Sequence, residues 1–166
     1  MSVDMFLKIT SAEGAVEGES TDKNHAGEID ILAWNWGLSQ SGSTHMGKGG
    51  GSGKVSVQDL SFTKYVDKSS PTLLKLCCKG THIPEALLTV RKAGGDDPVE
   101  YVKLKLKECI VSSITSGGSG GADRVTENIA LNFAEFHFEY TPQEADNSAG
   151  SSIPMGWSVA KNAEAS

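Results

Sequence analysis

The sequence predicts a mainly β fold with one short α-helix at about residues 70–79, arranged as a β-barrel or as a two-sheet sandwich. Several long segments alternate apolar and polar residues with the period of two that a strand requires. Glycine-rich turns separate these segments, and one segment changes phase, as a strand does where a sheet bends to close a barrel. A single compact apolar stretch carries the start and stop signals of a helix.

Composition limits the class of protein. The chain has 166 residues, of which 38% are hydrophobic and 22% are charged, which is typical of a single soluble globular domain over residues 1–166. The net charge of −6 and the scattered lysines argue against a nucleic-acid partner. No apolar run is long enough for membrane insertion. The N-terminal residues MSVDMFLKI lack the basic start of a secretion signal, so we expect a cytoplasmic location without a signal peptide. We expect the three cysteines to be reduced and buried.

The first predicted strand covers residues 2–10, and a polar connection over residues 11–24 contains at most one short pairing segment. The next strand, residues 28–39, places Trp34 and Trp36 on one face and Ala33 and Asn35 on the other. Because both faces carry apolar groups, we expect the core to cover the tryptophan face and to cover the opposite face in part.

An extended loop, residues 41–53, separates this strand from the next one at residues 54–66. It is much longer than a tight hairpin connection and rich in glycine, with Met46 as its one large apolar residue. Such a loop cannot bury itself. We therefore expect it to project from the sheet and either to contact a partner or to have no role.

The helix has signals at both ends. Ser69 or Ser70 can cap its start, Pro71 suits the first turn, and Gly80 suits a left-handed stop. The residues between are mostly apolar, Leu74 among them, so we expect one broad face of the helix to be buried.

The second half of the chain reads as a series of strands. Strands at residues 83–92 and 99–115 are joined by a turn at residues 93–98, and a loop at residues 116–122 precedes a strand at residues 124–141. A polar loop, residues 143–152, precedes a last strand at residues 153–162, and we expect residues 162–166 to be frayed.

Two patterns within these strands give finer predictions. The strand at residues 99–115 has an apolar face opposite a lysine face, and the residues of the apolar face are Val102, Leu104, Leu106, Ile110 and Ile114. The strand at residues 124–141 moves its apolar residues from odd to even positions near Ala134 and Glu135, which predicts a bulge or a corner there.

No pattern in the sequence assembles a catalytic site, a cofactor site or a metal site. The GxSxG match at Gly117–Gly121 lies between strands, whereas a hydrolase nucleophile needs a turn from strand to helix. The segment GGGSGK lacks the first glycine and the final hydroxyl residue of a phosphate loop. The histidines do not share a metal-motif spacing, so we expect ordinary loop or surface residues at His25, His45, His82 and His137.

Four segments resemble the haemolysin-coregulated proteins (Hcp), the tube subunits of the bacterial type VI secretion system: VDMFLKI, HAGEIDILAWNWGLSQSGSTHMGKGGGSGKVSVQDLSFTKYVDKSSPTLL, RKAGG and SGGSGGADRVTENIALNF. The resemblance covers most of the chain, and residues 11–18 and 143–153 depart from it. It implies a β-barrel of two antiparallel sheets with one short flanking α-helix, a homo-hexameric ring, rings stacked into a hollow tube, no enzymatic activity and no cofactor.

The resemblance also implies roles for residues and partners. It assigns ring stacking to Thr44, His45, Met46, Lys48 and Lys54 of this sequence. We expect Asn35 and Ala33 to line the lumen and contact effectors, and the core to hold Trp34, Trp36 and Leu74. The implied partners are the spike, baseplate and contractile sheath proteins and small effector proteins in the lumen, and the implied route is secretion out of the cytoplasm with the tube.

Two other functions fit the same residues. A ring could serve as an effector chaperone and secreted carrier instead of a long tube, because both uses need the same lumen. A monomeric β-sandwich could bind a ligand through its glycine-rich loops, although the tryptophans then lie in a strand and not in a binding cleft.

Overall fold

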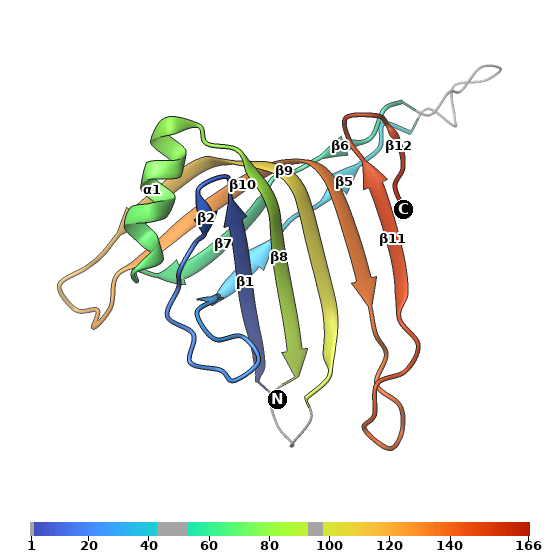
Figure 1. Cartoon of the computed structure of the whole chain (residues 1–166), viewed down its shortest axis with the longest axis horizontal. Coiled ribbons are helices and arrows are strands. Elements are labelled where there is room, and N and C mark those ends of the chain that lie inside the picture. Colours follow the sequence, from blue (N-terminus) through green and yellow to red (C-terminus); the bar gives the residue numbers. More distant parts are fainter. Residues whose placement is uncertain (1, 43–52, 93–97) are drawn as a thin grey trace.

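The structure, a computed structural model, describes residues 2–42, 53–92 and 98–166 of the chain. In these residues the elements are β1 (Val3–Ser11), β2 (Gly14–Ala15), β3 (Ile29–Asp30), β4 (Ala33–Asn35), β5 (Leu38–Ser39), β6 (Ser56–Val57), β7 (Leu60–Tyr65), α1 (Ser69–Lys79), β8 (Ile83–Lys92), β9 (Glu100–Gly117), β10 (Thr126–Tyr140), β11 (Ile153–Ser158) and β12 (Ala163–Glu164). Antiparallel strands curve around a core, and α1 lies at one end of the molecule (Figure 1).

The main sheet curls back towards its first strand. Its order is β12-β11-β10-β9-β8-β1-β2, and β10 also pairs with β7 along the edge that it shares with β11. The segment 29–35 joins β1 to β7, because β3 pairs with β1 and β4 pairs with β7. These ladders are short, and the barrel is not closed. The predicted mainly β fold with one helix and two antiparallel sheets is confirmed, the second sheet in the described residues being the β5–β6 ladder.

The two long strands predicted on either side of the extended loop are each broken. Residues 28–39 contain β3, β4 and β5, because the chain leaves one partner strand before it joins another. At that change the N–H of Ile31 donates to Met5 of β1 and the N–H of Leu32 donates to Thr63 of β7. Residues 54–66 contain β6 and β7, which belong to different sheets.

Strands β9 and β10 bend together. In β10, Phe133 and Phe136 are both buried although three positions separate them, so the predicted change of phase near Ala134 and Glu135 is confirmed. The irregularity on the neighbouring strand is Glu108, whose φ of 56° lies in the left-handed region.

The same irregularity changes the burial pattern of β9. Leu106 lies on the core side before Glu108 and Cys109 lies on it after, so Ile110 turns outward and is 41% exposed. The prediction that Ile110 shares the apolar face was therefore wrong. A register shift between Ala130 and Leu131 of β10 skips one residue of β9, which returns Ile114 to the core side.

The helix ends as predicted, because Gly80 adopts a left-handed conformation with φ 62° after Lys79. Its start differs from the prediction. Neither Ser69 nor Ser70 is the cap. The backbone N–H of Ser69 donates to Oδ1 of Asp67 at 2.9 Å, and both serine side chains are buried.

The predicted core position of Leu74 was wrong. Leu73 and Leu76 are buried at 0% and 1% exposure, but Leu74 is 49% exposed, because successive helical residues point about 100° apart and only one stripe meets the sheet. Trp34 and Trp36 are half-buried and pack against the core. Trp36 contributes to an aromatic cluster, with its ring 4.9 Å from that of Phe136.

The two neighbouring leucines of α1 give a matched test of this packing. We expect Leu73→Ala to lower the free energy of unfolding by about 2–5 kcal/mol, because it leaves a cavity in the core. We expect Leu74→Ala to change it by about 0.5 kcal/mol or less, because that side chain is half exposed. Urea denaturation of both variants measures the difference, and equal losses would contradict the assignment of the buried stripe.

The C-terminal residues were predicted to be frayed, but they pair with β11. Trp157 lies opposite Glu164 and Ser158 lies opposite Ala163 in the β11–β12 ladder. The N–H of Ala165 donates to the carbonyl of Gly156 at 3.1 Å. These hydrogen bonds order residues 163–165, so the prediction of a frayed tail at residues 162–166 was wrong there.

Candidate interaction surfaces

One outward surface of the sheet consists of small uncharged side chains. Cross-strand pairs bring these residues together on β4, β7, β10 and β9, and the set, here called the neutral face, is Ala33, Asn35, Ser61, Thr63, Asn128, Ala130, Ser113 and Thr115. The alternate residues of β7 and β10, such as Phe62 and Ile129, point into the core. Ala33 and Asn35, which the sequence analysis assigned to the lumen, are both exposed and belong to the neutral face.

A shallow cleft of about 90 Å³ lies in the neutral face between β4 and β7, and Asn35, Thr63 and Asn128 are among its lining residues. Thr63 donates to Oδ1 of Asn128 at 2.6 Å, so two of the polar groups are held by each other. Asp59 lies beside this surface. Its carboxylate accepts hydrogen bonds from Ser112 at 2.6 Å and from Asn132 at 2.8 Å, which pin the bulged part of β9.

A second surface, here called the β11 surface, is apolar and exposed. Its large side chains are Leu38, Tyr140, Ile153 and Met155, which are between 43% and 63% exposed. Tyr140 lies directly opposite Ile153 in the β10–β11 ladder. Met155 and Ile153 lie on the same face of the sheet as the buried Phe136. At β11, at the right of Figure 1, this face is no longer covered by other elements.

A groove of about 350 Å³ runs between the β5–β6 hairpin and β11. Its apolar lining includes Leu38, Phe136 and Met155, and Lys54 lies at its edge. The indole Nε1 of Trp157, another lining residue, is buried without a hydrogen-bond partner in the described structure. Lys54 is exposed beside the groove, whereas the other residues predicted to stack rings lie outside the described residues: Thr44, His45, Met46 and Lys48.

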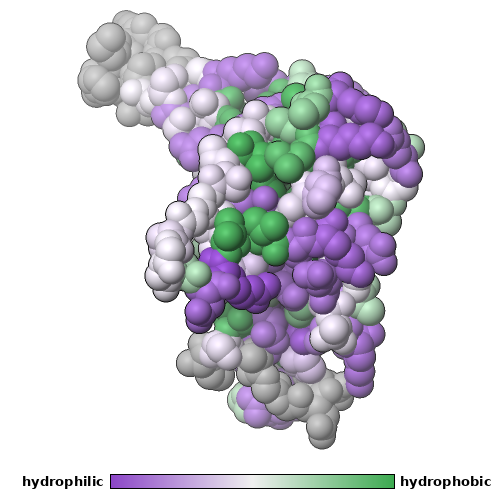
Figure 2. Space-filling model, turned by 90° about the vertical axis from the view of Figure 1, so that its left-hand side faces the viewer, coloured by the Kyte–Doolittle hydropathy of each residue, from purple (hydrophilic) through white to green (hydrophobic). Residues whose placement is uncertain are grey.

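A third surface, here called the helix-end surface, lies at the opposite end of the molecule. Its exposed apolar residues are Val66, Leu74 and Val125, which are between 44% and 49% exposed. Val66 donates its backbone N–H to the carbonyl of Val125 at 2.9 Å, so these two side chains belong to adjacent strand ends. Figure 2 views the molecule from this end and shows hydrophobic patches among hydrophilic side chains.

A buried ionic cluster joins β7, α1 and β10. Lys64 has no exposed surface, and its Nζ lies 2.5 Å from the carboxylate of Glu127, 2.8 Å from that of Asp67 and 3.1 Å from the hydroxyl of Ser70. Ser70 in turn donates to Glu127 at 2.6 Å. This cluster was not predicted from the sequence. The signal was present, because Lys64 lies in the core phase of its strand.

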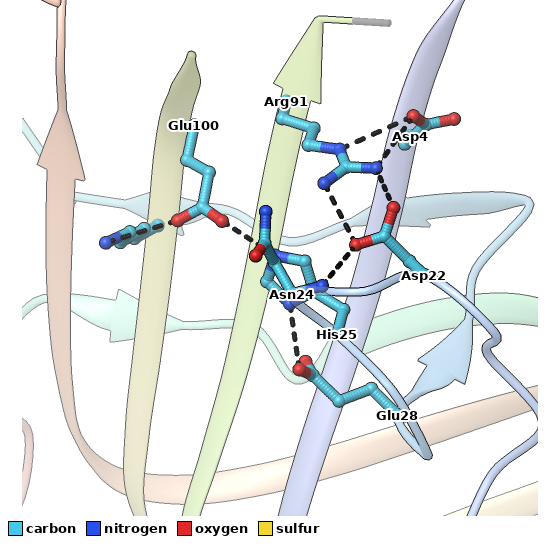
Figure 3. A network of polar contacts seen from close by, with 8 residues as sticks. Asp4, Asp22, Asn24, His25, Glu28, Arg91 and Glu100 are labelled. Carbon is cyan, nitrogen blue, oxygen red and sulfur yellow. Dashed lines mark hydrogen bonds and ion pairs between the residues drawn. The ribbon is translucent and has the colours of Figure 1, made fainter. Parts of the chain in front are cut away.

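A second ionic network surrounds His25, for which the sequence predicted a place in a loop or on the surface. His25 lies in a loop, as predicted, and it is buried at 7% exposure. Its ring contacts the carboxylates of Glu28 and Glu100 (Figure 3).

The other histidines have simpler surroundings. His82, directly before β8, and His137 of β10 each lie beside one glutamate and are more exposed than His25, and His45 lies outside the described residues. His25 is therefore the histidine with two carboxylate partners in the part of the chain that the structure describes.

Within residues 2–42, 53–92 and 98–166, no group of three metal-binding side chains could hold an ion. Of the helices described, none is long and apolar enough to cross a membrane. Burial raises the pKa of the Cys109 thiol to about 12, which makes it unreactive. Cys78 was predicted to be buried but is exposed, because it lies off the buried stripe of α1.

Comparisons with known proteins agree on one family. Residues 6–140 match the family described as "Type VI secretion system effector, Hcp". The chain is 58% identical over 166 residues to Protein hcp1 of Pseudomonas aeruginosa, covering 99% of this chain and 100% of that protein.

Solved structures give the same result. The fold matches the crystal structure of Hcp1 from Salmonella typhimurium with a TM-score of 0.81 at 38% identity, covering 99% of this chain and 100% of that one. A structure described as a type six secretion system protein matches with a TM-score of 0.90 at 31% identity, covering 99% of this chain and 100% of that one. The chain therefore belongs to the Hcp family of type VI secretion system proteins.

Proposed function

We propose that this chain is the subunit of a type VI secretion tube, in which six copies form a ring and rings stack around a lumen that carries effector proteins. Membership of the Hcp family supports the secretion role. The observation that carries the ring is the presence of two different exposed apolar surfaces, the β11 surface and the helix-end surface, at opposite ends of one molecule (Figure 1).

Two unlike surfaces at opposite ends favour a head-to-tail contact between copies. A surface that pairs with itself produces a closed dimer, whereas unlike surfaces produce a ring when the rotation between copies closes. In this proposal the helix-end surface of one subunit covers the β11 surface of the next. The contact buries Met155 and Ile153, which are 49% and 63% exposed in the single chain.

The neutral face is the proposed wall of the lumen. Asparagine, serine and threonine side chains can offer hydrogen bonds to cargo of either charge, and their small size keeps the channel open. Asn35 and Ala33 belong to this face, so we propose that they contact effectors. Ring stacking is proposed for Thr44, His45, Met46 and Lys48, and for Lys54 at the edge of the groove.

The proposed role is mechanical and requires no catalysis and no cofactor. The spike, baseplate and contractile sheath proteins are the proposed partners, and contraction of the sheath expels the tube from the cytoplasm to the outside of the cell. Uncharged hydrogen-bonding groups and apolar contacts suit this role, because a tube must assemble reversibly and release what it carries.

Light scattering and negative-stain microscopy of the purified chain test the proposal. We expect a mass close to six times 17.5 kDa and annular particles. Rings that never stack, even when nucleated by spike protein, would favour the effector carrier over the tube. A monomer at all concentrations, with or without spike protein, would contradict the ring and favour a monomeric binding module.

The lumen assignment makes a separate prediction. We expect Asn35→Arg to leave the ring intact but to reduce export of effectors about tenfold, because a large charge on the neutral face that costs the contact with cargo about 1.4 kcal/mol weakens binding by that factor. The control is Asn24→Arg, which adds the same charge at an exposed asparagine outside that face. Export measured by immunoblot of culture supernatants separates the two. If Asn35→Arg dissolved the ring instead, Asn35 would be an interface residue.

A further inference from the structure

We propose that His25 is a proton-dependent clasp, whose doubly protonated ring holds the segment 16–28, here called the strap, against the sheet. The inference does not depend on the ring or the tube. It concerns the chain between β2 and β3. This segment crosses the sheet near the start of β1 and the end of β8 (Figure 3).

The strap is a compact loop with its own hydrogen bonds. The N–H of Gly18 donates to the carbonyl of Gly27 at 2.8 Å, and the N–H of Gly27 donates to the carbonyl of Ser20 at 2.9 Å. The N–H of Ser20 donates to the carbonyl of Glu28 at 3.0 Å. These bonds join the two arms of the strap, so their amides exchange with solvent only when the arms separate.

The geometry at His25 requires a proton on each ring nitrogen. Nδ1 lies 2.8 Å from the carboxylate of Glu28, and Nε2 lies 2.7 Å from the carboxylate of Glu100. A neutral imidazole has one N–H and one lone pair, so it can donate to only one of two ionised carboxylates. The imidazolium ion donates to both. Losing the proton therefore breaks one of the two bonds and turns a lone pair towards a carboxylate.

The other groups around His25 make this the pH-sensitive link. Phe6 of β1 stacks on the imidazole with ring centroids 4.4 Å apart, which excludes water from one face. The remaining charges are Asp22 on the strap, Arg91 of β8 with its partner Asp4 of β1, and Lys103 of β9, which lies 3.4 Å from Glu100.

A second link holds the strap independently of pH in the neutral range. Arg91 binds the carboxylate of Asp22, and the hydrogen bond from Arg91 keeps the pKa of Asp22 below its usual value. Both of these groups stay charged between about pH 5 and about pH 8, where histidine titrates. Raising the pH thus removes one of the two His25 bonds, either the one to Glu28 within the strap or the one to Glu100 of β9, and leaves the Arg91 link in place.

The His25 end of the strap is the one that enters the sheet. Glu28 directly precedes β3, and the chain then continues into β4 with Ala33 and Asn35 of the neutral face. The segment that joins β1 to β7 is therefore held more firmly when His25 carries both protons than when it has lost one.

Hydrogen exchange of the full chain tests the clasp. From about pH 6 to about pH 8.5, we expect protection factors, which are corrected for intrinsic exchange, to fall about tenfold at the amides of Gly18, Ser20 and Gly27. In His25→Gln we expect the same amides to be less protected at the lower pH and to show no pH dependence. Amides of the β9–β10 ladder serve as the internal reference, because global opening of the fold would lower their protection factors as much as those of the strap.

Two further variants keep the test decisive. His137→Gln removes a histidine beside a single glutamate and should leave the pH dependence of the strap unchanged. Glu100→Gln keeps His25 but removes one of its two carboxylates. A neutral ring can then donate to Glu28 and accept from the new amide, so the pH dependence of strap protection should weaken. The clasp would be disproved by equal strap protection at both pH values in the wild type, or by an unchanged pH dependence in both His25→Gln and Glu100→Gln.

Discussion

Replacing Lys64 by methionine is expected to lower the free energy of unfolding by about 3–5 kcal/mol, the largest loss expected from a single change in this chain. Lys64 lies directly opposite Glu127 in the β7–β10 ladder and has no exposed surface. Without the ammonium group, the carboxylates of Glu127 and Asp67 remain buried with one counter-ion fewer. Urea denaturation followed by tryptophan fluorescence measures the loss.

The controls separate the charge from the packing. Lys68→Met changes an exposed lysine directly before the first residue of α1 and should cost about 0.5 kcal/mol or less. The double variant Lys64→Met with Glu127→Leu removes both charges of the cross-strand pair, and we expect it to be more stable than Lys64→Met alone. A double variant as unstable as the single one would show that shape, and not charge, sets the cost.

The same cluster predicts how stability changes in acid. Burial by itself raises the pKa of Asp67, but the hydrogen bonds from Lys64 and Ser69 outweigh it and hold the pKa below the usual value. A lowered pKa in the folded state stabilises the fold above the unfolded-state pKa of about 4, and this contribution is lost as the pH falls through the folded value. In Lys64→Met, the free energy of unfolding should therefore fall less steeply as the pH is lowered below about 4.

The second large effect is expected at the β11 surface. If the proposed ring contact is correct, Met155→Arg should convert rings to monomers, because a charge in the centre of an apolar contact costs each interface about 2 kcal/mol or more. The folded monomer should be unaffected, since Met155 is 49% exposed in the single chain. Light scattering measures the mass, and circular dichroism confirms the fold.

A complementary change at the other end tests the head-to-tail arrangement. Val125→Arg, on the helix-end surface, should also give monomers, and a mixture of the two variants should remain monomeric or stop at dimers, because each keeps one intact surface. The matched control is Ile110→Arg, which changes a residue of similar exposure on neither surface. Intact rings in Met155→Arg would remove the β11 surface from the proposal while leaving the family assignment unchanged.

The features that the sequence predicted are those set by periodicity. The corner in β10 was predicted because apolar residues change from odd to even positions around Ala134, and the burial of Phe133 and Phe136 follows that change. The exposure of Ile110 was not predicted, because the matching irregularity in β9 depends on the backbone of Glu108, whose side chain gives no such signal. The exposure of Leu74 depends on which stripe of an almost wholly apolar helix meets the sheet.

The two ionic clusters show a different limit of sequence reasoning. Lys64 and Glu127 occupy the core phase of their strands, so a charged residue in an apolar alternation was a usable signal for a buried pair. The network at His25 had no comparable signal, because Glu100 is 75 positions away from it in the chain and the two meet only when the strap folds over the sheet.

The shared edge of β10 has a consequence for how the chain folds during synthesis. Strand β7 is synthesised well before β10. Asn128, the hydrogen-bond partner of Thr63, lies 65 positions further along the chain. Until then the edge of β7 that β10 will cover is unpaired and able to join other strands. Strands β9 and β10 are neighbours in the sequence and form a hairpin, and both β7 and β11 pair with β10. Because β7 and β11 can align only after β10 is in place, formation of the hairpin should set the folding rate.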